Sequence, residues 1–171
     1  MIKTKKFTLR NPRKEDINEL WDNYNDKEIA KNMVSMEKEK EFKSDWINKF
    51  KNKKDKSREI DYTLVIEIEK KPAGLISIRS TDEYNKTKAT ISYRIGKNYR
   101  GRGITTQALK LFTVHALKKF KLTRIQANVR IFNKTSARIL EKVGYKLEGI
   151  RRKNVYKNGK FYDDLLYAKV K

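Results

Sequence analysis

Apolar residues in the first third of the chain recur at helical spacing. Residues 3–9 alternate weakly and predict an edge strand. After Pro12, four apolar residues fall at intervals that place them on one helical face: Ile17, Leu20, Trp21 and Tyr24. A second helix, which Ser35 can cap, is predicted from a further apolar set: Phe42, Trp46, Ile47 and Phe50. The N-terminal third is therefore expected to be mainly helical.

The middle of the chain changes to the period of two that is typical of strands. Residues 61–69 alternate between the two faces, and residues 75–79 return as the second strand of a hairpin. The turn between them is expected at Lys70–Gly74, where Pro72 and Gly74 interrupt the pattern. A polar loop, residues 80–87, separates this hairpin from a third strand at residues 88–95. These features predict a sheet.

From residue 96 onward, strands and helices alternate. A glycine-containing loop, residues 96–103, leads into a helix with five apolar positions: Ile104, Ala108, Leu111, Phe112 and Leu117. A strand follows at residues 123–129, and then a helix at 134–143 that Gly144 ends. Two further strands are expected at residues 145–150 and 161–170, with a turn at Asn158-Gly159 between them. This order predicts one α/β (α+β) domain over residues 1–171, built on a central mixed sheet.

The composition excludes several kinds of chemistry. The 171 residues include no Cys and one His, His115, so disulfides, a thiolate nucleophile, a Cys-based zinc site and a His-rich metal site are all excluded. No run of eighteen apolar residues predicts a membrane span, and no apolar stretch follows the N-terminus as in a secretory signal. A cytoplasmic location is therefore expected. His115 lies at helical spacing from apolar residues and is interpreted as structural or exposed, and not as a base.

The chain is strongly basic. It holds 43 Lys and Arg against 21 Asp and Glu, a formal net charge of +22. Such a charge suits nucleic acid, a ribosome, an anionic membrane or an acidic protein, and it disfavours a polycationic substrate such as a polyamine. Dispersed lysines are equally consistent with a bias in composition, and both interpretations remain open.

The segment with the clearest chemistry joins a strand to a helix at residues 98–108. Gly101 and Gly103 allow a sharp turn and a close approach of backbone to a ligand, while Arg100 and Arg102 offer charged donors. The free N–H groups at the start of the following helix favour an anion, so the segment predicts a phosphate cradle. The segment lacks the Lys-Ser/Thr pair of the Walker A loop, which binds nucleoside triphosphates. Thr106 also stands where the dinucleotide-binding fingerprint needs its third glycine, so neither motif is matched.

Five segments together resemble the GNAT acetyltransferases. The first is the loop sequence Tyr-Arg-Gly-Arg-Gly, which is similar to the family's pyrophosphate loop. The other four are residues 91–95, residues 133–136, residues 140–145, and the closing hairpin at residues 148–151 and 158–163. The closing hairpin resembles that of the ribosomal-protein N-terminal acetyltransferases, the RimJ/RimL branch. The resemblance covers most of the chain.

This resemblance implies a GNAT fold, with a central mixed sheet of about seven strands and about four flanking helices. It also implies a V-shaped splay between the fourth and fifth strands, residues 88–95 and 123–129, which holds acetyl-CoA. The implied cofactor-binding residues are Tyr93, Arg94, Ile95, Arg100, Gly101, Arg102, Gly103, Ile104, Thr105, Asn133 and Ser136. Structural alternatives remain open for some of them: Asn133 as a helix cap, Ser136 as a small packing residue, and Arg94 and Arg102 as solvated side chains.

The reaction implied is direct attack of an amine on the thioester carbonyl, without an acyl-enzyme. The chain departs from its relatives at two positions, with Thr90 where many of this branch carry Glu and Leu140 where many GNAT enzymes carry Tyr. Ser136 is then the expected donor of a proton to the thiolate, and Glu83 a base acting through water. Other acidic or phenolic candidates near the acceptor are Asp82, Tyr84, Asp163 and Asp164.

Three functions follow as hypotheses. The first is an acetyl-CoA-dependent N-acetyltransferase acting on a protein N-terminus, with a ribosomal protein as acceptor and an acidic protein or the ribosome as partner. The second is a small-molecule amine or antibiotic acetyltransferase, since a fold does not fix a substrate. The third is a catalytically idle basic module that binds nucleic acid or the ribosome. No membrane partner is expected, and a homodimer is left open.

Overall fold

The computed structural model describes residues 1–33, 38–51, 60–80 and 87–171. Within these ranges, eight strands form one sheet in the order β1-β2-β3-β4-β5-β6-β8-β7. Their bounds are β1 Ile2–Lys3, β2 Thr8–Arg10, β3 Asp61–Ile68, β4 Lys71–Ser80, β5 Lys88–Ile95, β6 Arg124–Arg130, β7 Lys146–Lys157 and β8 Lys160–Val170. The helices are α1 Ile17–Tyr24, α2 Lys27–Asn32, α3 Glu39–Lys51, α4 Ile104–Lys119 and α5 Lys134–Val143, with 3₁₀ turns at Lys14–Asp16 and Lys97–Tyr99.

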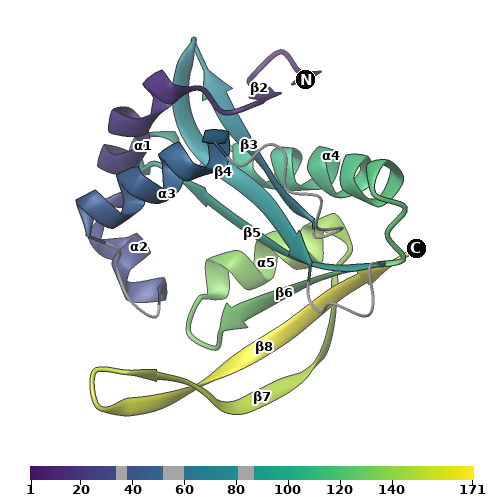
Figure 1. Cartoon of the computed structure of the whole chain (residues 1–171). Coiled ribbons are helices and arrows are strands. Elements are labelled where there is room, and N and C mark those ends of the chain that lie inside the picture. Colours follow the sequence, from purple (N-terminus) through teal and green to yellow (C-terminus); the bar gives the residue numbers. More distant parts are fainter. Residues whose placement is uncertain (34–37, 52–59, 81–86) are drawn as a thin grey trace.

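The helices cover both faces of the sheet (Figure 1). Alternate residues of β3 and β4 divide between two apolar clusters, because successive side chains of a strand point to opposite faces. Leu64 and Ile76 join the large cluster with residues of α4 and α5, whereas Val65 and Leu75 join the smaller cluster with residues of α1 and α3. The central strands are therefore buried on both faces, and α4 and α5 lie on the face opposite α1 and α3.

The sheet opens between β5 and β6. These neighbouring strands are parallel, and they pair only at Lys88–Arg124, Ala89–Ile125 and Thr90–Gln126. Beyond that point β5 remains paired with β4 as far as Ile95, and β6 remains paired with β8 as far as Arg130. The two strands no longer pair with each other there, which confirms the V-shaped splay expected from the resemblance.

The mixed α/β fold is confirmed, and four details differ from the sequence-based predictions. The single edge strand expected at residues 3–9 is two short strands, β1 and β2, joined by a tight turn that the Thr4 side chain stabilises. The β3–β4 turn is confined to Glu69 and Lys70, both with positive φ, so β4 begins earlier than residue 75. Strand β7 extends to Lys157, and the short helix α2 was not predicted. The expected cap Ser35 lies outside the described residues.

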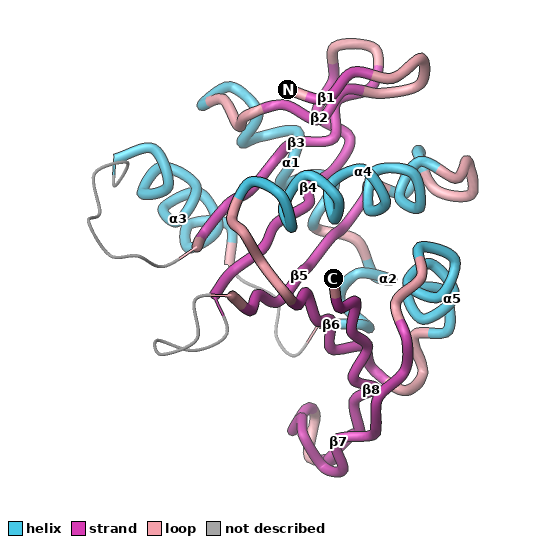
Figure 2. The backbone as a smooth tube through the Cα atoms, turned by 90° about the vertical axis from the view of Figure 1, so that its right-hand side faces the viewer, coloured by secondary structure: helices cyan, strands magenta, loops and turns pink. Residues whose placement is uncertain are grey.

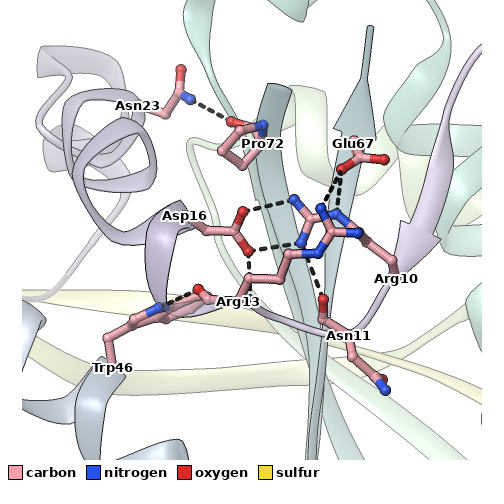
Figure 3. Close-up of polar contacts among 8 residues, drawn as sticks. All are labelled: Arg10, Asn11, Arg13, Asp16, Asn23, Trp46, Glu67 and Pro72. Carbon is pink, nitrogen blue, oxygen red and sulfur yellow. Dashed lines mark hydrogen bonds and ion pairs between the residues drawn. The ribbon is translucent and has the colours of Figure 1, made fainter. Parts of the chain in front are cut away.

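A buried ionic cluster ties the N-terminal segment to the sheet (Figure 3). The Arg10 guanidinium of β2 donates to both carboxylate oxygens of Asp16 and to Glu67 of β3. Arg10 and Asp16 are each about 4% exposed, so two full charges are held in the interior. Asp16 also accepts the backbone N–H of Arg13, at 2.7 Å, and the Arg13 carbonyl accepts the Trp46 indole N–H of α3, at 3.1 Å. The cluster thereby positions α1 and α3 over one face of the sheet.

Candidate cofactor and active site

The loop between β5 and α4 has the backbone conformation that its glycines predict. Gly101 and Gly103 have φ values of +76° and +71°, in the left-handed region that only glycine enters at little cost. A Cβ atom built on either residue would meet nothing within 4 Å. Neither glycine is therefore needed for packing against the protein, and the space beside both is open to a ligand.

The start of α4 presents free backbone donors at this loop. Gly103 occupies the N-cap position and has no side chain with which to cap the helix. The first hydrogen bond of the helix runs from Gln107 N–H to the Gly103 carbonyl, so the amides of residues 104–106 precede the bonded part of the helix. No acidic residue lies in its first turn, and Arg102 is exposed beside it. These amides and the helix dipole form a site for an anion such as a diphosphate.

The side chain of Arg100 does not face this site, contrary to the expectation that it adds a donor to the phosphate. Its Nε donates to the Ile95 carbonyl at 3.2 Å, its Nη1 to Glu28 at 2.6 Å and its Nη2 to Asp26 at 3.2 Å. Two acidic side chains at the start of α2 thus engage the guanidinium. Only the backbone of Arg100 remains a candidate for the phosphate, and Arg102 is the remaining side-chain donor of the pair.

Arg94 lies at the end of β5 but packs away from the loop. Its guanidinium carbon is 4.2 Å from the centre of the Tyr24 ring and 5.3 Å from the centre of the Phe42 ring, a cation–π arrangement. The solvated alternative for this side chain is therefore wrong. The pairing between β5 and β6 ends at Thr90, before Arg94 and Ile95. Their contact with a cofactor stays a prediction.

Two hydroxyl groups meet across the opening of the sheet. Tyr93 of β5 and Ser136 of α5 lie with their hydroxyl oxygens 2.8 Å apart, and the Tyr93 hydroxyl is also 3.3 Å from the Ser136 carbonyl. Asn133 caps α5, because its Oδ1 accepts the Ser136 N–H at 3.1 Å, and its contact with a cofactor stays a prediction. Burial raises the pKa of Tyr93 to about 12, and the hydrogen bond to Ser136 offsets only part of that effect. The phenol therefore keeps its proton at neutral pH.

Sequence reasoning assigned Tyr93 only a backbone role and missed its hydroxyl. The signal that could have found it is the strand period, which places Tyr93 and Ile91 on the same face of β5, toward the core that α4 and α5 cover. Glu83 and its neighbours Asp82 and Tyr84 lie outside the described residues. Glu83 therefore stays a prediction.

The remaining candidates hold structural contacts. His115 faces Tyr62, with 3.5 Å between Nε2 and the phenol oxygen, and burial, followed by the nearby Lys119 charge, lowers its pKa. Asp164 is buried, pairs with Arg130 and accepts the Asn154 amide at 2.9 Å.

Asp163 accepts the Lys153 backbone N–H at 2.7 Å. These contacts favour structural roles for His115 and both aspartates. Over the residues the structure describes, no group of three or more His, Asp or Glu side chains could hold a metal ion. No helix in those same ranges is long and apolar enough to cross a membrane.

The fold and site together define a mixed α/β protein with a site suited to an anionic ligand at a helix N-terminus, beside a split sheet. Residues 6–146 match the family model described as Acetyltransferase (GNAT) domain. The chain belongs to this family, and it is an acetyltransferase whose cofactor is acetyl-CoA. The open space beside Gly101 and Gly103, together with the amides of residues 104–106, fits the diphosphate of that cofactor.

Both related sequences and a solved structure support this assignment. The probable N-acetyltransferase YjcK of Bacillus subtilis is 33% identical over 122 residues, which are 71% of this chain and 67% of that protein. The ribosomal-protein-serine acetyltransferase of Escherichia coli is 31% identical over 97 residues, 57% of this chain, and the match spans about half of its length (54%). Among solved structures, a microcin self-immunity acetyltransferase in complex with acetyl-CoA and AMP superposes with a TM-score of 0.82 at 25% identity, covering 98% of this chain and 94% of that one.

Proposed function

We propose that this chain transfers the acetyl group of acetyl-CoA to the N-terminal amine of a protein, with ribosomal proteins as the acceptor class. The observation that carries the chemistry is the opening between β5 and β6, with free amides at the α4 terminus and a pair of hydroxyl groups at its edge. The acceptor class is supported by the name of the Escherichia coli relative and by the net charge of +22, which attracts acidic proteins and the ribosome.

The described residues divide the work between binding and proton transfer. The amides of residues 104–106 and the Arg102 side chain hold the diphosphate, and the part of β5 that has separated from β6 offers backbone groups near Tyr93 to an extended ligand. When bound, acetyl-CoA supplies the activated acetyl thioester. Ser136 Oγ is the proton donor, and the Tyr93 hydroxyl, 2.8 Å away, orients it and shares its proton.

Ser136→Ala tests the proton donor. We expect kcat to fall by about 10- to 100-fold, because a positioned general acid contributes at least that much, while the Kd for acetyl-CoA changes less than about threefold. Tyr93→Phe should lower kcat less, since Ser136 retains its own proton. The matched control is Thr135→Ala, which removes an exposed hydroxyl from the same turn of α5. Unchanged kcat for Ser136→Ala between roughly pH 6 and pH 9 would show that Ser136 is not the donor.

The acceptor is tested by measuring turnover on three groups of amines under one set of conditions. The groups are peptides with the N-terminal sequences of ribosomal proteins, spermidine, and antibiotics that carry a primary amine. We expect kcat/KM for the best peptide to exceed that for spermidine by at least about tenfold, since the basic surface repels a polycation. Acidic residues in the peptide should raise kcat/KM, and added salt should reduce that gain. A preference for spermidine or for the antibiotics would reject the proposed acceptor.

A further inference from the structure

Helix α2 has little packing of its own to hold it in place. It comprises the six residues Lys27–Asn32, none of them buried, and Ile29 is only partly buried against the smaller apolar cluster. A helix of this length is unstable alone, because too few hydrogen bonds follow its costly first turn. The position of α2 therefore depends on the groups that bind its two ends.

The first end is bound by the loop of the cofactor site. Asp26 caps α2 by accepting the N–H groups of Glu28 and Ile29, at 2.9 and 3.1 Å. Arg100 contacts the same Asp26 and also Glu28, in the only ion pairs that join α2 to that loop among the described residues. Burial alone would raise the pKa of Asp26, but the hydrogen bonds from Ile29 N–H and Arg100 outweigh it and lower the pKa. The cap is thus charged whenever Arg100 holds it.

The second end is bound by the β7–β8 hairpin. Lys157 is the last residue of β7, next to the Asn158-Gly159 turn, and its ammonium group donates to the carbonyls of Ala30, Met33 and Lys31 at 2.5, 2.6 and 3.3 Å. These carbonyls lie at the C-terminal end of α2, where helix carbonyls lack partners and the dipole favours a cation. Figure 1 shows the hairpin tip reaching beneath α2. All three donors of the lysine are used.

We propose that α2 is a strap whose two ends, held by Arg100 and Lys157, couple occupancy of the cofactor loop to the position of the β7–β8 hairpin. This inference rests on the proposed function for the identity of the cofactor, and it makes Arg100 and Lys157 positioning residues. The hairpin extends away from the body of the sheet (Figure 2), and residues 152–154 interrupt the register between β7 and β8. Its tip is therefore a part of the sheet that an external contact can move.

Hydrogen exchange measured with and without coenzyme A tests the strap without knowledge of the acceptor. In the unmodified chain, saturating coenzyme A should slow exchange about tenfold at the amides of α2 and of residues 155–162, as well as at the start of α4. Lys157→Met keeps the aliphatic stem and removes the ammonium group. We expect it to abolish the slowing at residues 155–162, while the slowing at the start of α4 persists at saturating coenzyme A. Because coupling is reciprocal, the Kd for coenzyme A should rise in this variant, by at most about tenfold. Glu28→Gln should weaken the effect at both α2 and the hairpin.

Lys160→Met is the matched control, since Lys160 is exposed and faces Lys157 across the same turn. It should leave the slowing at residues 155–162 intact. Binding of coenzyme A without any slowing at the hairpin would overturn the strap and leave the cofactor site standing. Equal loss in Lys157→Met and Lys160→Met would also overturn it, because the effect would then reflect hairpin stability alone. A chain that does not bind coenzyme A would instead reject the cofactor site together with the strap.

Discussion

Replacing Gly103 by Glu should raise the Kd for acetyl-CoA by at least about 100-fold, because a carboxylate at about 4 Å from a diphosphate charge costs several kcal/mol at an interface. Gly103 is the N-cap of α4, and the space beside its Cα is open. The new side chain would enter the region that the free amides face and would place a negative charge there. Isothermal titration with acetyl-CoA measures the loss directly, before any acceptor is known.

Two controls separate the causes of that loss. Gly103→Ala imposes the same positive φ of +71° on a residue with a Cβ, which costs on the order of 1 kcal/mol of stability, but it adds only a methyl group and no charge to the site. Gly103→Gln adds nearly the bulk of Glu without its charge. We expect the Kd to increase least for Ala, more for Gln and most for Glu. Equal affinity of the Glu variant and the unmodified chain would mean that the diphosphate binds elsewhere.

The elements that were predicted best from the sequence are those whose conformation is set by their own residues. Gly101 and Gly103 required positive φ, and Gly144 ends α5 in the left-handed conformation, because a turn or a helix end constrains its own residues. Helices α1, α3 and α4 follow from the spacing of their apolar residues. Helix α2 escaped prediction because six residues without a buried side chain leave no periodic pattern to detect.

The site was predicted less well, because its contacts join residues far apart in the chain. The Arg100 side chain was expected to contact the phosphate because it lies beside the glycines of the loop. Its actual partners, Asp26 and Glu28, lie more than seventy residues earlier in the chain. The Tyr93–Ser136 contact spans 43 residues and depends on the splay of β5 from β6, which brings the start of α5 near β5. The local sequence indicates which residues carry hydrogen-bond donors, whereas the tertiary fold decides which of those donors remain available to a ligand.

Asp16→Ala should reduce the free energy of unfolding by about 3 kcal/mol, because it leaves the buried Arg10 charge with one partner in place of two. Asp16 and Glu67 raise the pKa of Arg10 further above its usual value, so the guanidinium cannot relieve the loss by giving up its proton. The backbone N–H of Arg13 loses its acceptor as well. Urea unfolding followed by tryptophan fluorescence measures the change.

The exposed pair Asp61–Arg79 provides the comparison for this cluster. Its atoms are 3.6 Å apart and both side chains are more than half exposed, so Asp61→Ala should cost less than about 1 kcal/mol. Replacing Arg10 by Met together with Asp16→Ala should recover much of the stability that Asp16→Ala loses. No unbalanced cation then remains in the interior, and Glu67 keeps the exposed Arg13 as an ion-pair partner. If the single and double variants were equally unstable, the loss would come from the Arg13 turn and not from the buried charge. The ionic cluster would then act by fixing the backbone before α1, and Glu67 alone would suffice for Arg10.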